Sequence, residues 1–140
     1  MEISIANEDQ MKVWARRFTK TIKPNTLILL EGDLGVGKTF LVSQILQALG
    51  NSEACSPTYS LHNSYVCDDI LVEHFDLYRL ESVADLEAAG FFDIMSETNT
   101  IIFVEWADRL PNKVLPFGKE IIRIAIHLDG EIRKLNIEEL

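Results

Sequence analysis

One segment of the chain carries the residue types that bind phosphate. Residues 32 to 39 read Gly-Asp-Leu-Gly-Val-Gly-Lys-Thr, which matches the phosphate-binding loop pattern G-x-x-x-x-G-K-[ST]. A polyphosphate requires several backbone N–H groups directed at one point, and glycines let the chain fold closely around it. We expect Lys38 to reach the β- and γ-phosphates and Thr39 to offer its hydroxyl to Mg²⁺.

The predicted nucleotide contacts are this loop and the residue after it: Gly32, Asp33, Leu34, Gly35, Val36, Gly37, Lys38, Thr39 and Phe40. Guanine-specific loop proteins usually carry an Asn-Lys-x-Asp element. Here Asn112 and Lys113 are followed by Val114 and Leu115, so the carboxylate is missing. The sequence therefore favours ATP over GTP.

Phosphoryl chemistry at such a loop also requires a carboxylate at a strand end to hold the metal. Glu105 ends the apolar run Ile101–Val104, and we expect it to be a metal ligand together with Thr39. Asp76 ends a second apolar segment and is the candidate for activating water or for an outer contact to the metal. The predicted catalytic residues are thus Lys38, Asp76 and Glu105. Structural roles remain open at this point: Glu105 as a solvated strand-end carboxylate, and Asp76 as a helix cap or a partner of Arg79.

Four other residues are of the types that bind zinc. Cys55, His62, Cys67 and His74 are suitable ligands, but their spacing of seven, five and seven residues lacks the close cysteine pair of structural zinc sites. We interpret the histidines as ordinary strand residues and the cysteines as small core residues. Two cysteines make no disulfide framework, which indicates reduced thiols.

Composition sets the class of protein. The chain has 140 residues, 13 Lys and Arg against 22 Asp and Glu, and a net charge of −9. This length fits one domain, residues 1–140. The acidity argues against a protein that binds nucleic acid unaided, because that binding is largely phosphate neutralisation by basic residues. No targeting segment or bilayer-spanning apolar run is visible, so we expect a cytoplasmic protein with no membrane contact.

The elements that must position these residues follow from hydrophobic periodicity. We expect a short strand at residues 3–5, a helix from the capping pair Asn7 and Gln10 to about Thr21, a buried strand at 26–30 and a helix from Lys38 to Gly50. Further strands are expected at 58–66, 70–75, 100–104 and 122–128, with a turn at 67–69 and a short helix after Ser82. A two-residue turn at Asp129-Gly130 leads into a last strand holding Leu135 and Ile137. This order predicts one three-layer α/β domain of the P-loop NTPase kind, with a mostly parallel central sheet and antiparallel C-terminal strands.

The motifs together resemble the bacterial TsaE (YjeE) family over nearly the whole chain. Besides the loop, the resemblance rests on Ser56-Pro57-Thr58-Tyr59, on His74-Phe75-Asp76-Leu77-Tyr78-Arg79-Leu80, and on Val104-Glu105-Trp106, in the family's order and spacing. The chain departs from the family pattern in Phe40, where many members have threonine, in Ala107, where proline is common, and in a short C-terminal tail.

The resemblance implies an ATPase subunit that hydrolyses ATP slowly with Mg²⁺ and works with a TsaB–TsaD pair. TsaD transfers a threonylcarbamoyl group to an adenosine beside the anticodon of tRNA, and this chain would meet tRNA only through that complex. It implies phosphate and metal contacts at Lys38 and Thr39, metal at Glu105, a need for Asp76 in turnover, and a switch at residues 56–58. The residues that hold adenine stay open, with the turn at residues 7–9 and Arg133 as candidates. A small-molecule kinase and a non-hydrolysing nucleotide sensor are the alternative functions.

Overall fold

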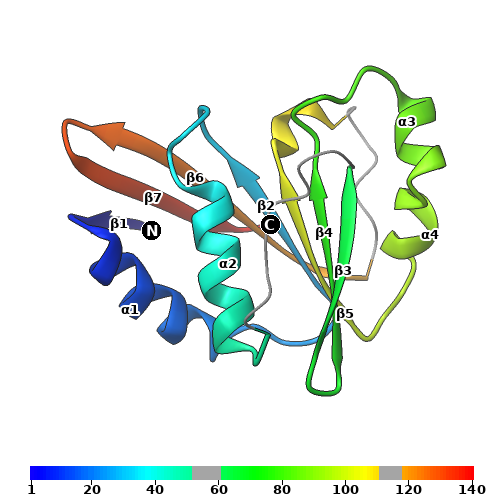
Figure 1. The fold of residues 1–140 in the computed structure, drawn as a ribbon, viewed down its shortest axis with the longest axis horizontal. Coiled ribbons are helices and arrows are strands. Elements are labelled where there is room, and N and C mark those ends of the chain that lie inside the picture. The colour runs from blue at the N-terminus through cyan, green and yellow to red at the C-terminus, as the bar shows by residue number, and fades with distance from the viewer. Residues whose placement is uncertain (52–60, 111–117) are drawn as a thin grey trace.

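The computed structural model describes residues 1–51, 61–110 and 118–140, and its elements follow the chain in the order shown in Figure 1. The strands are β1 (Glu2–Ile5), β2 (Thr26–Glu31), β3 (His62–Cys67), β4 (Ile70–Asp76), β5 (Thr100–Glu105), β6 (Glu120–Asp129) and β7 (Ile132–Glu139). The helices are α1 (Glu8–Thr19), α2 (Lys38–Ala48), α3 (Val83–Ala88) and α4 (Phe91–Met95), with a 3₁₀ turn at Ala107–Arg109.

All seven strands join one sheet in the order β1-β7-β6-β2-β5-β4-β3. The four central strands, β6, β2, β5 and β4, run parallel to one another, whereas β3, β7 and β1 pair antiparallel with their neighbours. The predicted mostly parallel centre with antiparallel C-terminal strands is therefore confirmed.

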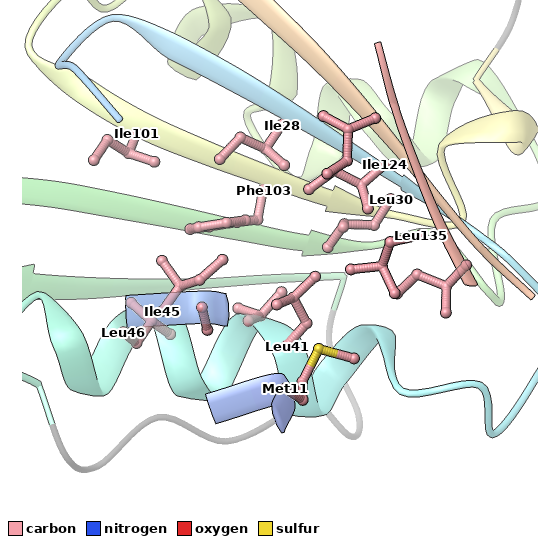
Figure 2. Close-up of a cluster of buried hydrophobic side chains, with 14 of the residues drawn as sticks. Met11, Ile28, Leu30, Leu41, Ile45, Leu46, Ile101, Phe103, Ile124 and Leu135 are labelled. Carbon is pink, nitrogen blue, oxygen red and sulfur yellow. The ribbon is translucent and has the colours of Figure 1, made fainter. Parts of the chain in front are cut away.

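The central strands are continuous apolar runs because the sheet is covered on both faces. On one face, α1 and α2 pack over a core that Figure 2 shows between the sheet and α2, including Phe103, Leu41 and Ile45. On the other face a second cluster joins Phe75 and Val104 to α3 and α4. Two helical layers with a sheet between them give the three-layer arrangement that was predicted.

Local signals set the ends of the first helix. The Asn7 side chain caps α1 by accepting a hydrogen bond from the backbone N–H of Gln10 at 2.9 Å, as expected. The helix ends at Thr19 instead of Thr21. The N–H of Thr21 donates a hydrogen bond to the carbonyl of Phe18, three residues earlier, which makes a tighter turn than the α-helix.

Other expectations need correction. Asp129 pairs with Ile132, so the hairpin loop is Gly130 and Glu131, one residue later than predicted; Gly130 takes the positive φ of 67° that this tight turn requires. The short helix α4 and the 3₁₀ turn were not predicted. The first residues of the strand expected at 58–66 lie outside the described residues. In the described part of the chain, no helix is long and apolar enough to cross a membrane.

Candidate functional site

The phosphate-binding loop joins the end of β2 to the start of α2 at the carboxyl edge of the parallel strands. Three glycines in it adopt positive φ: 146° at Gly32, 82° at Gly35 and 110° at Gly37. A Cβ on Gly32 would lie 2.5 Å from the carbonyl oxygen of Ile126, so only glycine lets the loop pass β6 this closely. The backbone N–H groups in the first turn of α2 have no acceptor within the helix, as at any helix start.

Lys38 is folded back onto its own loop. Its ammonium donates hydrogen bonds to the carbonyl of Gly32 and, at 2.9 Å, to that of Asp33. It also lies 3.9 Å from the centre of the Trp106 ring, and the residue is only 4% exposed. Burial lowers the pKa of Lys38, and the carboxylates of Glu105 and Asp108 oppose that shift. Lys38 is thus a poorly solvated cation whose hydrogen bonds go to carbonyls of its own loop.

Glu105 is the centre of a buried hydrogen-bond chain. One carboxylate oxygen accepts a hydrogen bond from the hydroxyl of Thr39 at 2.7 Å, and the other lies 2.5 Å from Nε2 of His74. Glu105 and His74 are each about 1% exposed. The reading of Glu105 as a solvated strand-end carboxylate is therefore wrong. Both of its oxygens are held in fixed positions, as a metal ligand requires.

Asp76 lies beside Glu105, because β4 and β5 pair these two residues in register. One of its oxygens accepts the backbone N–H of Tyr78 at 3.0 Å, so Asp76 organises the turn that follows β4. Burial raises the pKa of Asp76 and the charge of Glu105 adds to the rise, while the Tyr78 hydrogen bond opposes it. Two acids side by side in a partly buried site are held at a cost that a bound cation would relieve.

A cavity of about 370 Å³ opens over the loop and connects these groups. Besides loop residues, its lining includes Thr39, Asp76, Tyr78, Glu105 and Trp106, together with Glu8, Met11, Phe40 and Arg133. Its volume lies within the range of small-molecule sites. Of the predicted contacts, Leu34, Gly35, Gly37, Lys38, Thr39 and Phe40 line it, whereas Gly32, Asp33 and Val36 do not.

The donor set suits Mg²⁺ and a polyphosphate. Thr39 and Glu105 offer a hydroxyl and a carboxylate oxygen, the kinds of ligand that this ion takes. Lys38, the start of α2 and the glycine conformations offer positive partial charge and backbone donors to phosphate. The residues present therefore fit both groups.

Sequence reasoning missed the partners of two of these residues. His74 was interpreted as an ordinary strand residue, yet it holds Glu105; its position two residues before Asp76 on a strand, hence on the same face, was the available signal. Trp106 takes a left-handed conformation with φ of 58°, in the residue after Glu105, and its ring contacts Lys38. Such backbone strain is common at functional sites.

Some of the other predicted residues lie in the described part of the chain, and some lie outside it. His62 pairs with the buried Glu73, and Cys67 is a buried free thiol, as expected for a core residue. Arg133 lies at the cavity, as does Glu8; residues 7–9, expected to be a turn, are the N-cap and the first two residues of α1. Cys55, the switch expected at residues 56–58 and the segment at 112–115 lie outside the described residues.

The chain is similar in sequence and in fold to known proteins. The family model "Threonylcarbamoyl adenosine biosynthesis protein TsaE" matches residues 5–135. The curated tRNA threonylcarbamoyladenosine biosynthesis protein TsaE of Rickettsia bellii is 35% identical over 133 residues, which cover 94% of this chain and 90% of that protein. The protein of the same name from Nostoc sp. is 39% identical over 111 residues, covering 72% and 68% of the two chains. Among solved structures, Bacillus subtilis YdiB has a similar fold, with a TM-score of 0.74 at 24% identity, covering 98% of this chain and 83% of that one.

Proposed function

We propose that this chain, which belongs to the TsaE family, is a Mg²⁺-dependent ATPase that serves the threonylcarbamoyladenosine modification of tRNA. Family membership supports the role in this biosynthesis, and the site supports the nucleotide chemistry. The observation that carries the chemical part is the part-buried contact between Thr39 and Glu105 at the start of α2, beside Lys38. A hydroxyl, a carboxylate and a lysine in this arrangement match the parts of a phosphoryl-transfer site.

Each residue then has a role in the proposed reaction. Lys38 leaves the carbonyls of Gly32 and Asp33 and pairs with phosphate oxygens, which are stronger acceptors because they are charged. Thr39 and Glu105 hold Mg²⁺, while His74 fixes the orientation of the Glu105 carboxylate. Bound Mg²⁺ supplies the positive charge that stabilises the phosphates in the transition state. Asp76 orients the attacking water, since it lies beside Glu105 and both residues line the cavity.

The partners of this activity belong to the proposal as well. The names of the relatives place them in tRNA modification, and the family resemblance points to TsaD and TsaB homologues as the complex that this chain serves in the cytoplasm. A net charge of −9 argues that tRNA is reached through these partners and not by the chain alone.

The test has two parts. Purified chain with ATP, with and without Mg²⁺ and with no second substrate, should release phosphate only when the metal is present. A small-molecule kinase would release little without its acceptor, and a nucleotide sensor would bind ATP without turnover. Affinity purification from the source cell with ATP should recover a TsaD homologue. Failure to recover it, together with phosphate transfer to a small molecule, would refute the proposed function.

A further inference from the structure

Helix α1, which lies at the edge of its layer beside α2 (Figure 1), carries a cluster of cations that the proposed nucleotide site does not use. Five of the chain's 13 Lys and Arg residues fall within residues 12–23, and no Asp or Glu lies between Asp9 and Glu31. In the described part of the chain, the side chains of these five form no ion pair, although the protein carries a net charge of −9. We call them the basic face of α1: Lys12, Arg16, Arg17, Lys20 and Lys23.

The spacing of these cations works against the stability of α1. Lys12, Arg16 and Lys20 are four residues apart, so they follow one another along one flank of the helix. Like charges at this spacing repel and destabilise a helix. The helix dipole favours Arg16 and Arg17 in the last turn, but its effect does not extend back to Lys12. A row of cations with no carboxylate partner therefore indicates a surface that binds a negatively charged group.

A second cavity, of about 610 Å³, opens beside the basic face, between α1, the start of β6 and the end of β7. Trp14 and Phe18 line it and stack on each other, with ring centroids 4.9 Å apart. Arg17 belongs both to this cavity and to the basic face, and Ile122 and Ile137 add apolar surface from the sheet. Tryptophan and arginine are among the residue types that most often carry the binding energy of protein interfaces. The helix thus offers an apolar hollow next to a row of cations.

The chemistry of this surface fits a polypeptide better than RNA. Glu120 and Glu139 also line the second cavity. Their carboxylates would repel a phosphate backbone, but they can accept hydrogen bonds from the N–H groups of a peptide. The stacking of Trp14 on Phe18 covers one face of each ring, which leaves less surface for a base to stack on.

We propose that the basic face of α1 and the adjoining cavity form a docking surface for an acidic segment of a protein partner. Carboxylates of that segment pair with Arg16, Arg17 and Lys20, and one of its apolar side chains enters the cavity beside Trp14. The inference rests on the proposed function for the identity of the partner, the TsaD–TsaB homologues, and adds where and by which charges the chain binds them. Complementary charge of this kind speeds association and fixes the orientation of the two surfaces.

Biolayer interferometry with the purified chain and the purified TsaD–TsaB homologues of the source cell measures this affinity at low and at high salt. Arg16→Gln with Lys20→Gln should weaken binding roughly 2- to 30-fold at low salt, the range for two exposed ion pairs, and make the affinity less dependent on salt. Arg16→Glu with Lys20→Glu should weaken it further, because like charges then face each other. The affinity for ATP should stay at the wild-type value in both variants, since neither residue lines the nucleotide cavity, and this checks that the fold is intact.

The matched control removes the same total charge from the opposite face of the sheet. Arg123 and Lys134 each alternate along their strands with residues of the core under α1, so they point away from that helix. Both are already paired with carboxylates of the chain itself. Arg123→Gln with Lys134→Gln should therefore leave the affinity for the partners at the wild-type value.

Two results would overturn the inference. The first is a partner affinity that the α1 variants leave unchanged, or lower no more than the control does. The second is a loss of tRNA binding or of self-association in the α1 variants with no loss of partner affinity, since the basic face would then bind RNA or a second copy of this chain. Failure of the proposed function gives a different result, because the wild-type chain would then not bind the TsaD–TsaB homologues at either salt concentration, which would refute the partner and the inference together.

Discussion

Replacing Glu105 with glutamine separates metal binding from nucleotide binding. Both carboxylate oxygens are in use, one toward the Thr39 hydroxyl and one toward His74. A glutamine has the same shape: its oxygen can accept from His74, and its amide can donate to the Thr39 hydroxyl, which rotates to accept. We therefore expect the variant to fold and to lose only the negative charge that Mg²⁺ requires.

The size of the effect follows from the kind of contact that is lost. A hydrogen-bond-like contact to a charged group contributes about 1.5–3 kcal/mol. At about 1.4 kcal/mol per factor of ten, Glu105→Gln should weaken ATP binding in Mg²⁺ by roughly 10- to 150-fold. ATP binding in a chelator should be unchanged or slightly tighter, because a carboxylate no longer repels the phosphates.

Isothermal calorimetry with ATP in Mg²⁺ and in chelator measures both affinities. Glu73→Gln is the matched control, since Glu73 is also buried on a central strand and paired with a histidine, His62, but lies outside the cavity. That variant should leave both affinities at the wild-type value. If Glu105→Gln weakened binding equally with and without Mg²⁺, Glu105 would not be a metal ligand and the reasoning would be refuted.

Four further predictions follow from the site and from the net charge of the chain. Lys38→Ala should weaken ATP binding at least about tenfold, since it removes charge-assisted bonds to phosphate, while circular dichroism stays native; equal binding in calorimetry would remove Lys38 from the site. Asp76→Asn should keep ATP binding and lose hydrolysis in single-turnover measurements, and wild-type hydrolysis would discard its role with water. Asp76→Asn should also raise the melting temperature of the nucleotide-free protein at neutral pH, because a raised pKa means that ionising Asp76 destabilises the folded state. This gain in melting temperature should shrink as the pH falls toward 3.8, the usual pKa of the group, since Asp76 is then protonated in the wild type. A gain that does not change with pH would contradict this cause. Affinity for the proposed TsaD–TsaB partners should fall with added salt and should depend on whether ATP or ADP is bound. The chain alone should not bind tRNA, because its net charge of −9 repels a polyanion. Tight tRNA binding would refute this argument from charge.

Local sequence signals were sufficient for the parts of the fold that depend on neighbouring residues. The phosphate-binding loop, the cap at Asn7 and the apolar strands β2 and β5 are each specified within a few residues, and the structure has all of them. The two acidic strand ends at Asp76 and Glu105 could also be identified. That they lie side by side follows from the β4–β5 register, which no single segment specifies.

The contacts that sequence reasoning missed join segments far apart in the chain. His74 pairs in register with Phe103, yet its ring reaches Glu105 two residues further along β5, a diagonal contact that depends on the rotamer. Arg133 reaches Val36 across 97 positions, because β7 folds back antiparallel on β6 beside the loop. Strand alternation indicates that His74 shares a face with Asp76, but spacing along the chain does not identify Glu105 or Val36 as the partner in either contact.

The groups that strain the nucleotide-free protein are the ones assigned to its chemistry. Burial disfavours the charged forms of both Lys38 and Asp76, although the two charges have opposite signs. They do not form a simple ion pair, because Lys38 donates its hydrogen bonds to loop carbonyls and Asp76 accepts a hydrogen bond from the backbone N–H of Tyr78. A polyphosphate would give the lysine a charged partner, and a divalent cation would give the acids one. Under the proposed function the site binds an anion and a cation side by side, and each would stabilise the folded protein according to its concentration and affinity, because it binds the folded state and not the unfolded chain.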